Sequence, residues 1–104
     1  IPDSALHRSP VRMSEILITK KHRLSAKKAR TAAELVAADL EKEFNLVHEW
    51  DEEGVLHFER MGVHGQLTLG RGEVTIHIHL GFLLRPFKSG LEREIHDYFD
   101  ARFA

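Results

Sequence analysis

The sequence predicts a two-layer α+β domain, in which an antiparallel sheet carries two helices packed on one face. Apolar and polar residues alternate in five short segments, which is typical of strands that are buried on one side. Two longer segments place apolar residues three or four positions apart, which predicts amphipathic helices. Turn signals separate the last four strands, so we expect hairpins and the element order β-α-β-β-β-β-α.

The first strand is expected over residues 15–22, where two isoleucines alternate with polar residues. Ser25 is a good N-cap for a helix over residues 26–44, and Asn45 is a plausible stop. The alanines of this helix favour helical structure and leave a thin surface, which permits close approach to a sheet. Its apolar stripe is Ala29, Ala33, Val36, Leu40 and Phe44.

Four strands are then expected at 46–50, 55–60, 63–69 and 74–80, separated by DEEG, Met61-Gly62 and Arg71-Gly72 turns. The hairpin registers bring apolar or small residues opposite one another, which makes the arrangement self-consistent. The predicted core face consists of Val47, Leu56, Phe58, Leu67, Leu69, Val74, Ile76 and Ile78.

The last helix is predicted from a capping box, in which Ser89 is followed three residues later by Glu92. Apolar residues then recur every four positions, so both helices can cover the core face of the sheet. These residues are Leu91, Ile95, Phe99 and Phe103. We expect a single domain at residues 13–104, preceded by a flexible extension or cloning remnant at 1–12 that has two prolines and no periodic pattern.

Composition narrows the classes of function. The chain has 104 residues, a net charge of −1 and no cysteine, which excludes thiolate nucleophiles and sulfur-ligated zinc. The charge gives no electrostatic footprint for nucleic acid, and no apolar run is long enough to span a membrane. We therefore expect a cytoplasmic protein that binds neither nucleic acid nor the bilayer interior.

Histidines gather on the second face of the predicted sheet. His64 and His79 should oppose one another, with Glu59 on the other side of His64, and His48 should lie near His57. Such a group could bind a metal, through His64, His77, His79, Glu59 and His57. An ordinary polar or partner-covered surface is the alternative, and we expect at most weak zinc affinity and no resident cofactor. Trp50 and Val55 are expected on the same face.

Catalytic templates are incomplete in this sequence. No serine is accompanied by a histidine and an acid at a recognisable nucleophile elbow, and Ser25 and Ser89 are better explained as helix caps. Glu59 and His64 could form an acid/base pair, but without a cleft we interpret them as an ordinary cross-strand pair on an open sheet. We predict no catalytic residues and no enzymatic activity.

Several motifs together are similar to a known family. They are His22-Arg23-Leu24 after the first strand, the alanine-rich helix, EW at 49–50, GVLHFER at 54–60, GVHGQLTLG at 62–70 and LGFLLRPFKSGLEREI at 80–95. From residue 16 onward the chain resembles the small bacterial proteins of the polyhydroxyalkanoic acid system family, also described as polyhydroxyalkanoate granule-region proteins. The resemblance implies an association with the storage polyester of 3-hydroxyacyl units, by gene neighbourhood and naming. It implies no known reaction, and the HIH at 77–79 departs from the expected pattern.

The LGFLL segment is more apolar than a loop requires. Its apolar residues either plug the open end between the sheet and the helices, or remain partly exposed to contact a hydrophobic granule, an acyl chain or a second subunit. Our leading hypothesis is a non-enzymatic accessory or binding protein at the surface of the polyhydroxyalkanoate granule or on granule proteins. The alternatives are a carrier of small acyl ligands and a metal-dependent enzyme that uses the histidine face. We also expect a homodimer, through the histidine face or the residue 82–87 edge. The candidate contact residues are Trp50, Phe82, Leu83, Leu84 and Phe87.

Overall fold

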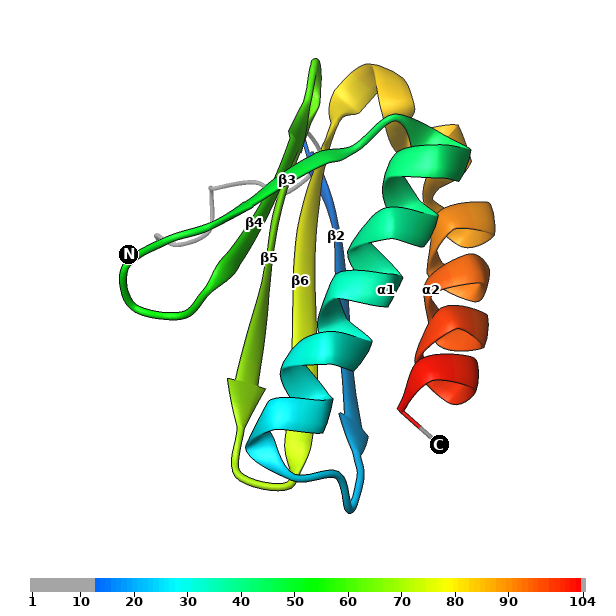
Figure 1. Cartoon of the computed structure of the whole chain (residues 1–104). Helices are drawn as coiled ribbons and strands as arrows, with labels where there is room; N and C mark the ends of the chain where they lie inside the picture. The colour runs from blue at the N-terminus through cyan, green and yellow to red at the C-terminus, as the bar shows by residue number, and fades with distance from the viewer. Residues whose placement is uncertain (1–12, 104) are drawn as a thin grey trace, which may run out of the picture.

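The computed structural model describes residues 13–103, which form a five-stranded antiparallel sheet and two long helices (Figure 1). The predicted extension at residues 1–12 lies outside this range. The strands are β2 (Met13–Lys21), β3 (Val47–Trp50), β4 (Leu56–Arg60), β5 (Val63–Gly70) and β6 (Glu73–Gly81), in the spatial order β2-β6-β5-β4-β3. The helices are α1 (Ala26–Phe44) and α2 (Lys88–Arg102), joined to β6 by the 3₁₀ helix η2 (Phe82–Phe87). The predicted α+β class and element order are confirmed.

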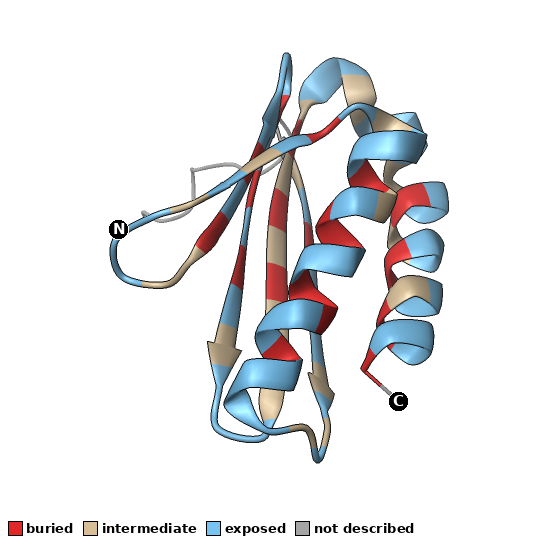
Figure 2. Ribbon diagram, in the orientation of Figure 1, coloured by how far each residue is buried: buried red, intermediate tan, exposed pale blue. Residues whose placement is uncertain are grey.

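Both helices lie side by side on one face of the sheet, and no element of residues 13–103 covers the other face, which we call the open face (Figure 1). Figure 2 shows that buried positions on the helices and strands turn toward this shared layer. Helix α1 contributes mainly alanines to the layer, which lets its backbone approach the sheet closely. Helix α2 contributes the larger Leu91, Ile95 and Phe99.

The ends of α1 confirm the predicted caps. Ser25 Oγ accepts a hydrogen bond of 3.2 Å from the backbone N–H of Lys28, which satisfies one free donor of the first turn. Asn45 ends the helix in the left-handed conformation, with φ of 60°, and its N–H donates to the carbonyl of Glu41. The residues that the local sequence predicts as caps therefore mark both ends of this helix.

The predicted capping box of α2 is wrong. The helix begins at Lys88, directly after η2, so Ser89 lies within the first turn and Phe87 occupies the N-cap position without a side-chain hydrogen bond. The reason is that η2 runs into α2 and supplies acceptors for its first donors. The backbone N–H of Lys88, for example, bonds to the carbonyl of Arg85. A serine cap has no free helix end to close here.

The predicted register of the central hairpins is confirmed. Leu67 pairs with Ile76 on one side and Leu56 on the other, and Gly65 stands between Phe58 and Ile78. A Cβ on Gly65 would lie 2.8 Å from Ile78 Cγ1, so only glycine fits this position without a shift of its neighbour. Leu69, another predicted core residue, is half-buried and packs against the edge of the core.

Strand β3 has the opposite orientation to the one predicted. Val47 was expected in the core but is exposed, whereas His48 and Trp50 face the helices as partners of the buried Phe58 and Leu56. The hairpin loop contains five residues, Asp51–Val55, instead of the four-residue DEEG turn. One additional loop residue shifts the register by one, which turns every side chain of the strand to the other face.

Candidate functional site

Exposed apolar side chains gather at one end of the molecule, which we call the apolar end and define as Met61, Phe82, Leu83 and Phe87. These are four of the seven large hydrophobic residues that are exposed within the described part of the chain, and Leu83 and Met61 are 84% and 92% exposed. Figure 1 shows that η2 and the β4–β5 turn meet at this end of the sheet. A cluster of this kind is a feature of surfaces that contact other molecules.

The β4–β5 turn and η2 are fixed to one another by backbone and side-chain contacts. Gly62 has a positive φ of 83°, and its carbonyl accepts a hydrogen bond of 2.8 Å from the backbone N–H of Gly81. A Cβ on Gly62 would lie 2.9 Å from Leu84 Cδ1, so glycine also provides room for this leucine. Leu84 is half-buried against the core, and its burial holds η2 in place. The remaining apolar residues of η2 are left exposed.

A pocket of about 340 Å³ opens beside the apolar end, between the end of α1, η2 and the start of α2. Leu84 and Phe87 both line it, because a 3₁₀ helix places residues three apart on the same side. The guanidinium of Arg60 stands in the lining and donates a hydrogen bond of 2.8 Å to the carbonyl of Phe44. The other lining residues are Glu43, Asn45, Leu46, Val63, Leu80 and Leu91. The pocket is mostly apolar, with polar groups at the α1 end.

The open face of the sheet carries the histidines in cross-strand rows. One row runs through Glu15, His79, His64 and Glu59, which are directly paired on β2, β6, β5 and β4. His77 belongs to the next row, two residues along β6. The predicted clustering of His64, His77 and His79 on one face is therefore confirmed, because alternate residues of β6, including Ile76 and Ile78, are buried on the other face.

Within this face the side chains form separate groups. His77 Nε2 and Glu15 Oε1 share a hydrogen bond of 2.9 Å, and His79 Nδ1 lies 3.8 Å from Glu15 Oε2. The hydrogen bond from His77 lowers the pKa of Glu15, with a smaller contribution from the nearby His79. His64 Nδ1 instead lies 3.5 Å from Glu59 Oε2. Within the described residues, one set of side chains is close enough to bind a single metal ion: Glu15, His77 and His79.

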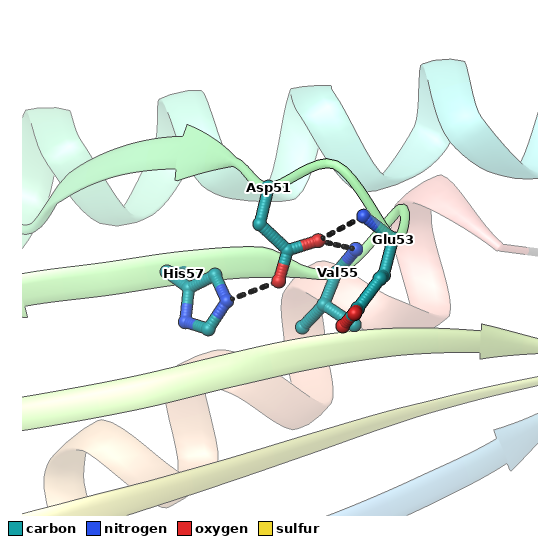
Figure 3. A network of polar contacts seen from close by, with 4 residues as sticks. All are labelled: Asp51, Glu53, Val55 and His57. Carbon is teal, nitrogen blue, oxygen red and sulfur yellow. Dashed lines mark hydrogen bonds and ion pairs between the residues drawn. The ribbon is translucent and has the colours of Figure 1, made fainter.

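His57, the fifth predicted ligand, is occupied elsewhere. Its Nε2 lies 2.7 Å from Asp51 Oδ2, while Asp51 Oδ1 accepts hydrogen bonds from the backbone N–H groups of Glu53 and Val55 (Figure 3). The Val55 hydrogen bond is the main reason why the pKa of Asp51 lies below its ordinary value, followed by the His57 hydrogen bond. His57 thus takes part in closing the β3–β4 loop.

His48 and Trp50 belong to the helix-covered side, so their predicted place on the open face is wrong. Trp50 Nε1 donates a hydrogen bond of 2.9 Å to Glu34 Oε2, and the Arg30 guanidinium lies 3.8 Å above the indole ring. His48 Nδ1 lies 3.1 Å from the Glu41 carboxylate without hydrogen-bond geometry. Both residues attach β3 to α1. Trp50 is also distant from the apolar end. It pairs with Leu56 at the start of β4, whereas Met61 follows the other end of that strand.

Glu15 was missed as a candidate ligand by sequence reasoning. Its alternation with Ile16 and Ile18 indicates the polar face, but its neighbours there depend on which strand β2 joins. The chain pairs β2 with β6, across more than 50 intervening residues, and this places Glu15 opposite His79. The alternation in the sequence therefore indicates the face on which Glu15 lies, but it does not indicate that β6 is the neighbouring strand.

The fold and these surfaces define a small two-layer α+β domain with an exposed apolar end and a polar, histidine-bearing open face. The family model described as "Putative polyhydroxyalkanoic acid system protein" matches residues 16–103. The chain belongs to this family, as its motifs predicted. In the other comparisons, no curated protein and no solved structure matched significantly. Among the described residues, neither long helix has the length and hydropathy required to cross a bilayer.

Proposed function

We propose that this protein is a non-enzymatic accessory protein of the polyhydroxyalkanoate system, which binds the surface of the storage polyester granule in the cytoplasm through its apolar end. Membership of the family supports a role connected with the polymer. The observation that carries the proposal is the exposure of Met61, Phe82, Leu83 and Phe87 on two segments that are locked together at one end of the domain.

The physical basis of the proposed binding is the hydrophobic effect at a preformed surface. Burying an exposed leucine or phenylalanine side chain contributes roughly 1.5–3 kcal/mol, so several that act together can hold a small domain on an apolar polymer. The backbone hydrogen bond between Gly81 and Gly62 and the anchored Leu84 keep the apolar end ordered before binding. Little conformational entropy is then lost on adsorption.

The test is cosedimentation of the purified protein with polyhydroxyalkanoate granules. We expect Leu83→Asp and Phe87→Asp each to lower the affinity for granules by about tenfold or more, because each removes apolar contact and adds a charge that must be desolvated. Leu35→Asp is the matched control, since Leu35 is an exposed leucine on α1, away from η2. Circular dichroism shows whether each variant is folded. Equal granule binding by the wild type and both η2 variants would contradict the proposal.

The pocket beside the apolar end favours a second candidate, a carrier of small acyl ligands. Its volume of about 340 Å³ and its apolar lining suit a short acyl chain, with Arg60 available for a carboxylate. The two functions differ in their dependence on Leu83, which is exposed but does not line the pocket. Calorimetric binding of a 3-hydroxy fatty acid that persists in Leu83→Asp, combined with no granule binding by the wild type, would favour the carrier.

A further inference from the structure

We propose that Glu15, His77 and His79 form an exchangeable site for a divalent transition-metal ion, such as Zn²⁺, on the open face of the sheet. The proposal does not depend on granule binding, because the site lies on the sheet face that the helices and the pocket do not use. It adds Glu15 to the predicted histidines and leaves His57, His64 and Glu59 outside the first coordination sphere.

The geometry of three side chains on two paired strands supports the site. Their ligand atoms all lie within 4.8 Å of one another. Ligand atoms around a tetrahedral zinc ion lie about 3.3 Å apart, for bonds of about 2.0–2.1 Å. The observed separations fall on either side of that value: 2.9 Å from His77 Nε2 to Glu15 Oε1, and 3.8 Å from His79 Nδ1 to the other carboxylate oxygen, Oε2. Small side-chain rotations on a fixed sheet would therefore bring all three to a common ion.

The register explains why these side chains converge. Glu15 stands directly opposite His79, and His77 is two residues along the same strand, so all three project from adjacent positions on one face. The two imidazole rings are already close, with centroids 4.4 Å apart. Strands β2 and β6 are paired over nine residues, which holds the three Cα positions in place before any ion arrives.

The chemistry of the ligand set selects the kind of metal. Two imidazoles and one carboxylate suit zinc, cobalt, nickel or copper, whereas magnesium and calcium prefer several oxygen ligands. Three protein ligands leave coordination positions for water or for an external ligand. The half-exposed histidine side chains are open to solvent, so we expect rapid exchange and a dissociation constant in the micromolar range, weaker than that of a closed structural zinc site.

Isothermal titration with ZnCl₂ tests the site, and the visible absorption of bound Co²⁺ reports its coordination. We expect one ion per chain in the wild type, and about tenfold or greater weakening in each of Glu15→Gln, His77→Ala and His79→Ala. His57→Ala and His64→Ala are matched controls on the same face and should change the affinity less than about twofold if the site is as proposed. Melting curves in the presence of a chelator show whether each variant folds normally.

Two results would overturn this proposal. One is the absence of zinc binding to the folded wild type at millimolar zinc, and the other is undiminished binding to the Glu15→Gln, His77→Ala, His79→Ala triple variant. Leu83→Asp separates this site from the proposed granule surface, because it should bind zinc as the wild type does.

Discussion

At the scale of single residues, Asp51 closes the β3–β4 loop. Its carboxylate accepts two backbone hydrogen bonds and contacts His57, so it holds both the loop and the start of β4 (Figure 3). Hydrogen bonds to the ionised carboxylate lower the pKa of Asp51; the largest contribution comes from the Val55 N–H and a smaller one from His57. Asp51 therefore stabilises the five-residue loop whose length gives β3 the opposite orientation to the one predicted.

The depressed pKa predicts a pH dependence of stability that Asp51 controls. Because the folded state favours the ionised form, this stabilisation is complete above the unfolded-state pKa of about 3.9 and is lost as the pH falls through the lower folded-state value. We expect Asp51→Asn to be less stable than the wild type at neutral pH. We also expect it to lose less free energy of unfolding on acidification from about pH 5 to pH 2. Urea unfolding at several pH values measures this difference. Glu52→Gln in the same loop is the control, and identical acid sensitivity of Asp51→Asn and the wild type would contradict the assignment.

At the scale of elements, the two long helices begin in different ways. Helix α1 starts from a free end that Ser25 caps, whereas α2 continues a 3₁₀ helix and has no such end. The same arrangement that removes the cap of α2 also exposes η2, because a six-residue 3₁₀ helix can bury only the side that carries Leu84. One junction therefore determines both a helix boundary and the candidate binding surface.

This difference predicts unequal effects of two serine substitutions. Ser25→Ala should lower the free energy of unfolding by about 1 kcal/mol, because the N–H of Lys28 loses its acceptor. Ser89→Ala should change it by less than about 0.5 kcal/mol, since Ser89 is exposed within the first turn of α2. Urea denaturation of both variants measures the contrast, and comparable losses would mean that Ser89 caps α2 after all.

At the scale of the whole molecule, the two exposed surfaces have different characters. The open face carries histidine–carboxylate groups, with the exposed Leu17 and Val47 far apart on its two edge strands, whereas the apolar end gathers its hydrocarbon beside a pocket. Trp50, which the sequence predicted on the open face, belongs to the helix side, so it is not available for a contact through the open face. The apolar end is therefore the stronger candidate for self-association.

Self-association in the absence of polymer is the prediction at this scale. Two copies that meet about a two-fold axis would cover both apolar ends at once, so we expect a concentration-dependent homodimer. Leu83→Asp should shift it to the monomer. Because His57, His64, His77 and His79 project from the open face and not from the apolar end, the dimer should persist as the pH falls from about 7.5 to about 5.5, across the range in which free histidine titrates. Light scattering measures both effects: a monomeric wild type would exclude the dimer, and a dimer lost on acidification would move the interface to the histidines.

The sequence by itself determined the ends of α1, the register of the central hairpins and the family. Ser25 and Asn45 define α1, and the Gly-containing turns set the register of β4, β5 and β6. These features depend on neighbouring residues, whose periodicity and turn chemistry act over a few positions. The same patterns predicted which histidines share a face, and the motifs predicted the family that the comparison then confirmed.

Only the tertiary structure decided which segments meet. It paired β2 with β6, which brought Glu15 to His77 and His79, and it turned Trp50 toward α1 through one additional loop residue. It also joined the β4–β5 turn, which carries Met61, to η2, which carries Leu83, through the contacts of Gly62 with Gly81 and Leu84. The physical reason is that strand pairing and packing are non-local: a sequence pattern assigns a side chain to a face, but the free energy of the whole core selects its neighbours.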